Sequence, residues 1–191
     1  NSGQICIAGA RILLQRDIAE RFIEAFVART QSLKVGNPLD PSTEVGPMAF
    51  KAHWQRVLDH IARARSDGAS LLCGGEARVD LGDGYFIAPT VFQVDNNQLS
   101  LCQEEVFGPV VSIQIFDDDD EALSLANDSR FGLVGYCWTN SLARAQAFQQ
   151  QVEAGTLWIN TPLARDLRAP FGGFKESGIG RDGPRQAAEF F

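Results

Sequence analysis

Cys6 is the residue of this sequence with the most distinctive chemistry. It ends the short, mostly polar and glycine-containing stretch NSGQIC and does not lie within an apolar run. A thiolate attacks electrophilic carbon far better than a thiol does, and backbone N–H donors around a loop cysteine favour the thiolate. The alternative is a small buried hydrophobic side chain, which is the commoner role of an arbitrary cysteine. Both interpretations stay open on Cys6 alone.

Charged side chains stand near two further glycine- or proline-containing stretches. EEVFGP holds Glu104 and Glu105, and a carboxylate accepts two O–H donors from a bound ligand. LARDLRAP, which precedes PFGG, holds Arg165, Asp166 and Arg168, and a guanidinium holds a carboxylate through two parallel hydrogen bonds. Neither stretch needs to bind a ligand. The acidic residues of the first could simply be solvated, and an arginine of the second could form a surface ion pair.

Other patterns have a structural explanation. GIGRDG at 178–183 satisfies the glycine spacing of dinucleotide-binding loops, but FKES precedes it where that motif needs a strand. The run from Asp117 to Asp120 lacks the spacing and closing glutamate of an EF-hand, so we expect it to begin a helix, where acidic residues are favoured. We expect no metal site, because the four cysteines are widely spaced and only two histidines occur.

The composition argues against several classes of partner. The 17 Lys and Arg residues are scattered among 24 acidic ones, and the net charge is −7, so neither nucleic acid nor an anionic membrane is an expected partner. No apolar run approaches the ~20 residues that a membrane span needs, and the amino terminus lacks the order of a signal peptide. The cysteine spacing suggests no disulfide framework, which favours the cytoplasm.

The elements that must position these residues alternate between strand and helix. Apolar residues at helical spacing predict helices, and short apolar runs between turn residues predict strands. The predicted strands are 10–15, 69–75, 84–92, 108–116, 134–139 and 156–160, and the predicted helices are 18–33, 50–68, 121–128 and 143–155. Pro89 places 84–92 at a sheet edge. This alternation predicts one α/β domain with a mostly parallel sheet and helices on both faces.

Several of these stretches, taken in order, resemble the aldehyde dehydrogenase superfamily. The matching motifs are NSGQICIAGAR, EEVFGP, GTLWIN and PFGGFKESGIGR, with GNP at 36–38 and YFIAPT at 85–90 between them. Together they cover nearly the whole chain, which makes the resemblance far more specific than one short motif. The resemblance implies that residues 1–191 are the catalytic domain of such an enzyme.

The resemblance also implies roles for individual residues. Cys6 attacks the aldehyde carbon to give a thiohemiacetal, hydride leaves to a nicotinamide, and water hydrolyses the resulting thioester. The backbone N–H of Cys6 donates to the oxyanion. Glu105 binds the hydroxyls of the nicotinamide ribose, Phe107 lies against the cofactor, and Phe171 lines the substrate tunnel. The cofactor is NAD or NADP, between which these residues do not choose.

The segment LARDLRAPFGG resembles the subgroup that oxidises hydroxymuconic or aminomuconic semialdehydes, which carry a carboxylate. The resemblance therefore implies a small carboxylated aldehyde as the substrate, with Arg165 as the first candidate to hold its carboxylate. Arg168 is the second candidate, and it could equally pair with Asp166 or support the loop.

Members of this family also carry a cofactor-binding domain before the cysteine loop and an arm that takes part in homo-oligomerisation. The resemblance places the general-base glutamate and a ribose-binding lysine upstream of the cysteine loop, so we expect residues 1–191 alone to bind NAD poorly and to turn over little. Without its usual preceding strand, the loop around Cys6 is expected to be poorly ordered.

Two other function classes stay open. One is a noncatalytic interaction domain of the same fold, and the other is a cysteine-dependent hydrolase or thiol enzyme. A hydrolase needs a base near sulfur, and the only histidines, His53 and His60, lie on one face of a predicted helix. The retained Cys6, Glu105 and Phe171 favour descent from an active parent.

Overall fold

Strands and helices alternate along the chain as the sequence predicts. The computed structural model describes residues 1–190 and groups them into two units: unit 1, Asn1–Asp117, and unit 2, which begins at Asp118. The single domain predicted over 1–191 stays a prediction, and each unit is described by itself. The α/β class is confirmed, because each unit combines helices with parallel strand pairs.

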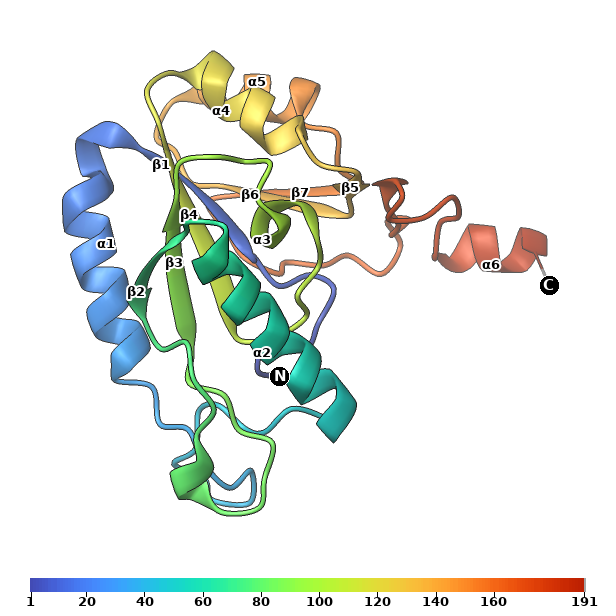
Figure 1. Ribbon diagram of the computed structural model, residues 1–191. Helices are drawn as coiled ribbons and strands as arrows, with labels where there is room; N and C mark the ends of the chain where they lie inside the picture. The colour runs from blue at the N-terminus through green and yellow to red at the C-terminus, as the bar shows by residue number, and fades with distance from the viewer. Residues whose placement is uncertain (191) are drawn as a thin grey trace. The chain divides into compact units, whose positions relative to one another are not determined.

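Unit 1 is built on a four-stranded sheet of order β1-β4-β3-β2 (Figure 1). Neighbouring strands β1, β4 and β3 are parallel, and β2 runs antiparallel to β3. The elements of unit 1 are β1 (Arg11–Gln15), α1 (Arg16–Gln31), α2 (Lys51–Ser66), β2 (Ser70–Cys73), the 3₁₀ helix η1 (Val79–Leu81), β3 (Thr90–Val94), α3 (Ser100–Gln103) and β4 (Val110–Phe116).

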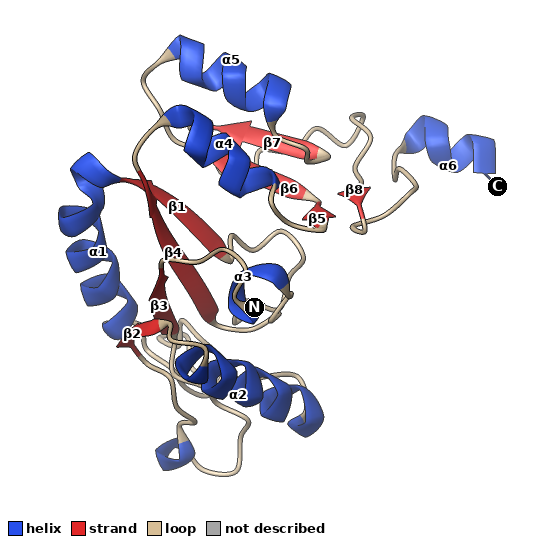
Figure 2. Ribbon diagram, turned by 45° about the horizontal axis from the view of Figure 1, so that its top comes forward, coloured by secondary structure: helices blue, strands red, loops and turns tan. Residues whose placement is uncertain are grey.

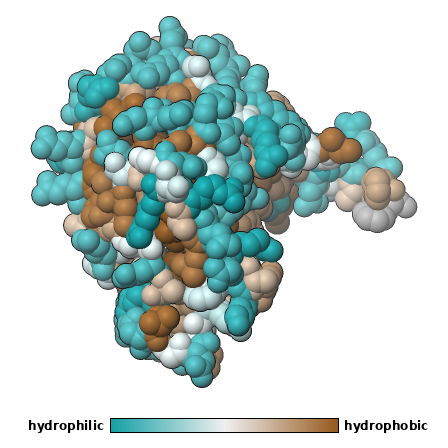
Figure 3. All heavy atoms as spheres, in the orientation of Figure 1, coloured by the Kyte–Doolittle hydropathy of each residue, from teal (hydrophilic) through white to brown (hydrophobic). Residues whose placement is uncertain are grey.

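Helices α1 and α2 cover opposite faces of this sheet (Figure 2). Successive side chains of β3 point to opposite faces of the sheet. Val91 packs in the core on the α1 side, whereas Phe92 packs with Val57 and Ile61 of α2. Full burial of each such side chain contributes about 1.5–3 kcal/mol to folding. Figure 3 shows hydrophilic side chains along the outer edge of α1, as expected for an amphipathic helix. The mostly parallel sheet with helices on both faces is therefore confirmed for unit 1.

The edge position predicted from Pro89 is wrong. Strand β3 begins at Thr90, directly after the proline, and lies between β4 and β2. Proline removes a backbone donor only at its own position, so it is compatible with a central strand that starts one residue later. The Thr90 N–H donates to the Pro109 carbonyl at 2.8 Å and so begins the ladder with the next strand.

Unit 2 contains two short sheets, in which β6 pairs parallel with β7 and β5 pairs antiparallel with β8. Asp118 caps helix α4 by accepting from the Glu121 N–H at 2.9 Å, which confirms the helix start predicted for the aspartate run. The elements of unit 2 are α4 (Asp119–Asn127), β5 (Phe131–Gly132), β6 (Val134–Cys137), α5 (Leu142–Gln151), β7 (Thr156–Ile159), β8 (Phe174–Lys175) and α6 (Pro184–Phe190).

The glycine pattern at 178–183 follows the two-residue strand β8, which pairs antiparallel with β5. A strand thus precedes the pattern, contrary to the expectation, but a dinucleotide-binding loop follows a parallel strand, whereas β8 is antiparallel to its partner. Among residues 1–190, no helix is long and apolar enough to cross a membrane.

Candidate active site

Cys6 lies on a pair of turns at the start of unit 1. The Gln4 N–H donates to the Asn1 carbonyl at 2.9 Å, and the Ala8 N–H donates to the Ile5 carbonyl at 2.9 Å. Cys6 follows Ile5 in the second turn, where its own N–H is not used by the turn, and no hydrogen bond of that N–H occurs within residues 1–190. The side chain is exposed. The loop therefore presents a thiol and a free backbone donor side by side.

Hydrogen bonds fix this loop on the segment that leads into α2. The Ser2 hydroxyl donates to the Gly46 carbonyl at 2.8 Å. The Gln4 side chain accepts from the Ala49 N–H at 2.9 Å and donates to the Pro47 carbonyl at 3.4 Å. Polar side chains of the NSGQ stretch thus tie the loop to residues 46–49, and the poor order expected for it stays a prediction.

The other cysteines differ from Cys6 in their burial. Cys73 and Cys102 are buried and Cys137 is half-buried. Burial raises the pKa of all three thiols, because it penalises the charged thiolate. Among the residues that the structure describes, Cys6 is the one exposed cysteine, and the other three are less able to form thiolates at neutral pH.

The EEVFGP stretch follows α3 and separates its two carboxylates. Glu104 lies 3.4 Å from Arg63 and 3.8 Å from His60, both on α2. Glu105 is exposed, and its carboxylate has no partner among residues 1–190. Of the acidic pair, Glu104 is therefore engaged within the protein and Glu105 is available to a ligand, and the role expected for Glu105 stays a prediction.

Phe107 follows the buried Val106, has 37% of its surface exposed and adopts a φ of +55°. Its carbonyl oxygen lies 2.7 Å from Nε2 of His53, and Nδ1 of the same imidazole lies 3.1 Å from a guanidinium nitrogen of Arg56. Both nitrogens of His53 are engaged in this way, and His60 lies beside Glu104. Within residues 1–190, neither histidine bonds to Cys6, so the base that a cysteine hydrolase would need is not supplied by a histidine.

Sequence reasoning missed His53 as a site residue. A signal was present, because His53 occupies the same helical stripe as Val57 and Ile61, and a polar residue on a buried stripe needs a partner. No pattern in the sequence identifies that partner as the carbonyl of Phe107.

A cleft of about 550 Å³ lies between the cysteine loop, the start of α2 and Phe107. Aromatic and long polar side chains surround it, an arrangement suited to a ligand with a planar ring and polar substituents. The lining residues are Asn1, Gln4, Ala49, Phe50, His53, Arg56 and Phe107. The cleft thus joins the loop that carries Cys6 to the loop that carries Phe107, but neither Cys6 nor Glu105 is among its lining residues.

The expected substrate residues Arg165, Arg168 and Phe171 all belong to unit 2. The Arg165 guanidinium lies over the Phe171 ring, 4.9 Å from its centroid, and within residues 1–190 no carboxylate pairs with it. Arg168 instead binds Asp166, with its Nε 2.9 Å and a terminal nitrogen 2.6 Å from the two carboxylate oxygens. This ion pair lowers the pKa of Asp166 and raises the pKa of Arg168. Arg168 is therefore paired with a carboxylate of its own loop, whereas Arg165 is not.

Asn160, the last residue of the GTLWIN motif, has a structural role. Its side-chain oxygen accepts from the Thr139 N–H at 2.8 Å, and its amide donates to the Thr139 carbonyl at 2.7 Å. Trp158 then fixes the following turn by donating from Nε1 to the Ala164 carbonyl at 2.6 Å. These bonds hold the segment from which Arg165 projects.

Known proteins resemble this chain over nearly its whole length. A betaine aldehyde dehydrogenase of Mesorhizobium japonicum is 43% identical over 184 residues, which are 95% of this chain and 38% of that protein. The crystal structure of HpcC from Thermus thermophilus matches with a TM-score of 0.96 and 41% identity. A betaine aldehyde dehydrogenase (betB) from Staphylococcus aureus, in complex with NAD⁺, matches with a TM-score of 0.95 and 38% identity. Both structural matches cover 100% of this chain and 38% of the other.

The chain thus spans 38% of the length of these relatives. None of the three names is that of a muconic semialdehyde dehydrogenase, so the closer likeness to that subgroup stays a prediction. The family model described as "Aldehyde dehydrogenase family" matches residues 1–191, and the family predicted from the motifs is confirmed. The chain belongs to the aldehyde dehydrogenase family.

Proposed function

We propose that this chain supplies the nucleophile and part of the cofactor site of an NAD- or NADP-dependent enzyme that oxidises an aldehyde to a carboxylic acid. The observation that carries the proposal is the exposed thiol of Cys6 beside its own unused N–H, on a loop that shares a cleft with Phe107. An exposed thiol with a backbone donor beside it is suited to adding to a carbonyl group.

Cys6 performs the covalent chemistry in this proposal. Its thiolate adds to the aldehyde carbon, a C–S bond forms, and the carbonyl oxygen becomes an oxyanion that accepts from the Cys6 N–H. The nicotinamide cofactor, when bound, takes up the hydride and its two electrons from this carbon. The thioester left on Cys6 is then attacked by water, the C–S bond breaks, and the acid leaves while sulfur recovers its thiolate.

Residues of the EEVFGP stretch fit a nicotinamide cofactor. The carboxylate of Glu105 is exposed and unpaired within residues 1–190, so both of its oxygens are free to accept ribose hydroxyls. Phe107, partly exposed at the edge of the cleft, offers an apolar contact for a planar ring. The NAD⁺ complex of the S. aureus relative supports NAD as the cofactor.

For the substrate we propose a small aldehyde that carries a carboxylate. Arg165 has no carboxylate partner within residues 1–190, whereas Arg168 is paired with Asp166. A quaternary ammonium such as betaine aldehyde is recognised by open aromatic faces, and one face of Phe171 is already covered by the Arg165 guanidinium. Electrostatics at this loop therefore favour an anionic substrate over a cationic one.

The cellular location and the oligomeric state are also proposals. Free cysteines fit the reducing environment of the cytoplasm. Homo-oligomerisation of the complete enzyme follows from the family resemblance alone.

The test is NADH formation from aldehydes by the longest natural form of this protein. Cys6→Ser should reduce kcat by about 10³-fold or more, because the hydroxyl is a much weaker nucleophile. Cys137→Ser is the matched control, since it makes the same replacement at a half-buried thiol in unit 2, and it should retain activity. Equal activity of the two variants would contradict the role of Cys6.

A further inference from the structure

Phe107 has a backbone conformation that its side chain disfavours. Its φ of +55° lies in the left-handed region, which glycine adopts freely and other residues adopt rarely. Such a conformation persists only where surrounding contacts hold it. The position of the Phe107 ring therefore depends on whatever fixes its backbone.

His53 provides one such contact from the first turns of α2. A guanidinium nitrogen only donates hydrogen bonds, so Nδ1 of His53, 3.1 Å from Arg56, is the acceptor. The proton of the neutral imidazole is then on Nε2, which donates to the Phe107 carbonyl at 2.7 Å. His53 is 8% exposed, so little water competes for this hydrogen bond.

The next turn of α2 provides the second contact. Val57 packs against Gly108 so closely that a Cβ on that glycine would lie 2.9 Å from its Cγ2 atom. His53 and Val57 are four residues apart and share one helix face. Residues 107–108 are thus held against α2, whereas Glu105 on the same stretch stays exposed.

We propose that His53, as its Nε2–H tautomer, positions the Phe107 backbone, and with it the Phe107 ring, for the nicotinamide cofactor. This inference rests on the proposed function, because it gives His53 a role toward the cofactor of that reaction. Both ring nitrogens of His53 bind groups of the protein, so it acts through Phe107 as a positioning residue.

The test compares substitutions at His53 in the longest natural form of the protein. His53→Leu removes the donor, whereas His53→Gln keeps an N–H for the Phe107 carbonyl and an oxygen for Arg56. We expect His53→Leu to weaken NADH binding, measured by fluorescence titration, by about tenfold, because the Phe107 carbonyl loses its buried hydrogen bond. KM for NAD should rise by a similar factor while KM for the aldehyde changes little, and His53→Gln should restore most of the affinity.

His60→Gln is the matched control, because it replaces the other histidine of α2, whose Nδ1 has no hydrogen-bond partner within the described residues. It should leave NADH binding unchanged. If leucine at position 53 prevents folding, His53→Asn gives the same comparison, since its shorter side chain does not reach the carbonyl.

Three outcomes would overturn the inference: unchanged NADH binding in His53→Leu, equal losses in His53→Leu and His53→Gln, or an equal loss in His60→Gln. A wild-type protein that neither binds NADH nor oxidises aldehydes would overturn the proposed function as well. A wild-type protein that does both, with His53→Leu behaving identically, would overturn this inference alone.

Discussion

Gly3 packs directly on Gly108: a Cβ built on Gly3 would lie 2.0 Å from the Gly108 carbonyl oxygen, and Gly3 has a φ of +72°. The first glycine belongs to the loop that presents Cys6, and the second follows Phe107. The glycine therefore allows the proposed nucleophile loop and the proposed cofactor loop to touch through their backbones. The Ser2 hydroxyl, which donates to the Gly46 carbonyl, and the Gln4 side chain, which accepts from the Ala49 N–H, also hold this loop.

Gly3→Ala should separate these two loops. The new methyl group has no space against the Gly108 carbonyl, and an L residue at this φ costs about 1–2 kcal/mol in addition. Because misplacement of a reacting group by about 1 Å reduces rates roughly 10²-fold, kcat/KM for aldehyde oxidation should fall by about that factor. Steady-state kinetics and thermal unfolding of the same samples measure the two effects.

Gly9→Ala is the matched control for this substitution. Gly9 lies close to Gly3 in sequence, a Cβ there would meet nothing within 4 Å, and its φ is not positive. Its substitution should leave both the kinetics and the melting temperature unchanged. Similar values for the two alanine variants would show that the contact between Gly3 and Gly108 does not position the thiol.

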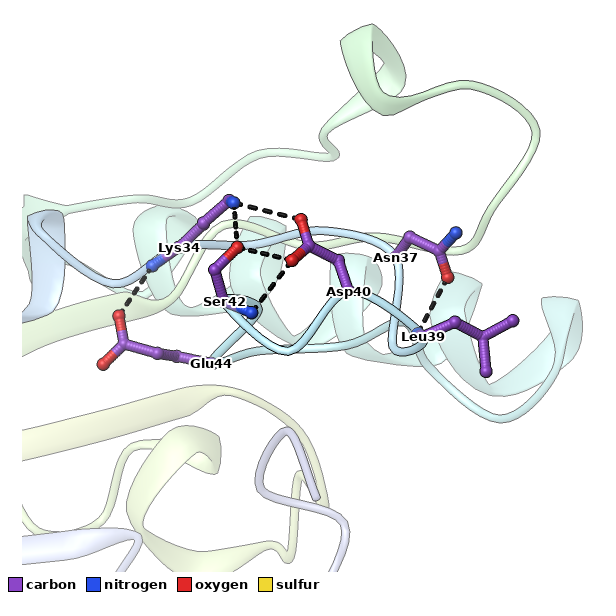
Figure 4. Close-up of polar contacts among 6 residues, drawn as sticks. All are labelled: Lys34, Asn37, Leu39, Asp40, Ser42 and Glu44. Carbon is purple, nitrogen blue, oxygen red and sulfur yellow. Dashed lines mark hydrogen bonds and ion pairs between the residues drawn. The ribbon is translucent and has the colours of Figure 1, made fainter.

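Asp40 illustrates a charge effect in the long loop between α1 and α2 (Figure 4). It accepts from the Ser42 hydroxyl at 2.6 Å and from the Ser42 N–H at 2.9 Å, and Lys34 lies 3.1 Å from its other oxygen. These contacts, the Ser42 hydroxyl first, lower the pKa of Asp40 from 3.8 to about 2. Since the folded-state value is the lower one, its contribution to stability is complete above about pH 4 and is lost as the pH falls toward 2.

Ser42→Ala should therefore raise the pKa of Asp40 toward 3.8, as measured by NMR titration of the carboxyl carbon. Lys34→Gln should raise it as well, because the lysine lowers this pKa through both its hydrogen bond and its charge. The loop of the serine variant should then loosen at a higher pH than in the wild type. An Asp40 that titrates at 3.8 in the wild type would contradict this account.

Local patterns were sufficient to predict most elements. The strand at β1 and the helices α1 and α2 follow from apolar periodicity, and the helix start at Asp118 follows from capping chemistry. The edge position predicted from Pro89 was wrong, because the missing N–H of a proline affects only its own position. Strand β3 begins one residue later, at Thr90.

Contacts between residues far apart in the sequence could not be predicted from the sequence. Cys6, Glu105 and Phe107 were predicted from motifs, but the pairing of His53 with the Phe107 carbonyl joins residues on separate elements, and no local pattern encodes it. The sequence ranked Arg165 before Arg168 as the substrate anchor, but it could not establish that Arg168 pairs with Asp166. Only the geometry of the loop assigns Asp166 to Arg168.

Arg165→Gln should separate substrates by their charge. If Arg165 holds the carboxylate of a semialdehyde, its loss removes a charge-assisted contact worth about 1.5–3 kcal/mol, and kcat/KM for that substrate falls roughly 10- to 100-fold. A neutral aliphatic aldehyde should be oxidised as before. Betaine aldehyde should be oxidised equally well or better, because a repulsive charge has been removed.

Arg168→Gln changes the net charge of the loop by the same amount and serves as the control. Because Arg168 is already paired with Asp166, this variant should retain the preference for the carboxylated substrate. Equal losses in the two variants would mean that only overall charge matters, and a wild type that prefers betaine aldehyde would exclude the anionic substrate. Kinetics with all three aldehydes therefore decide whether Arg165 is a specific anchor or an arginine that only stacks on Phe171.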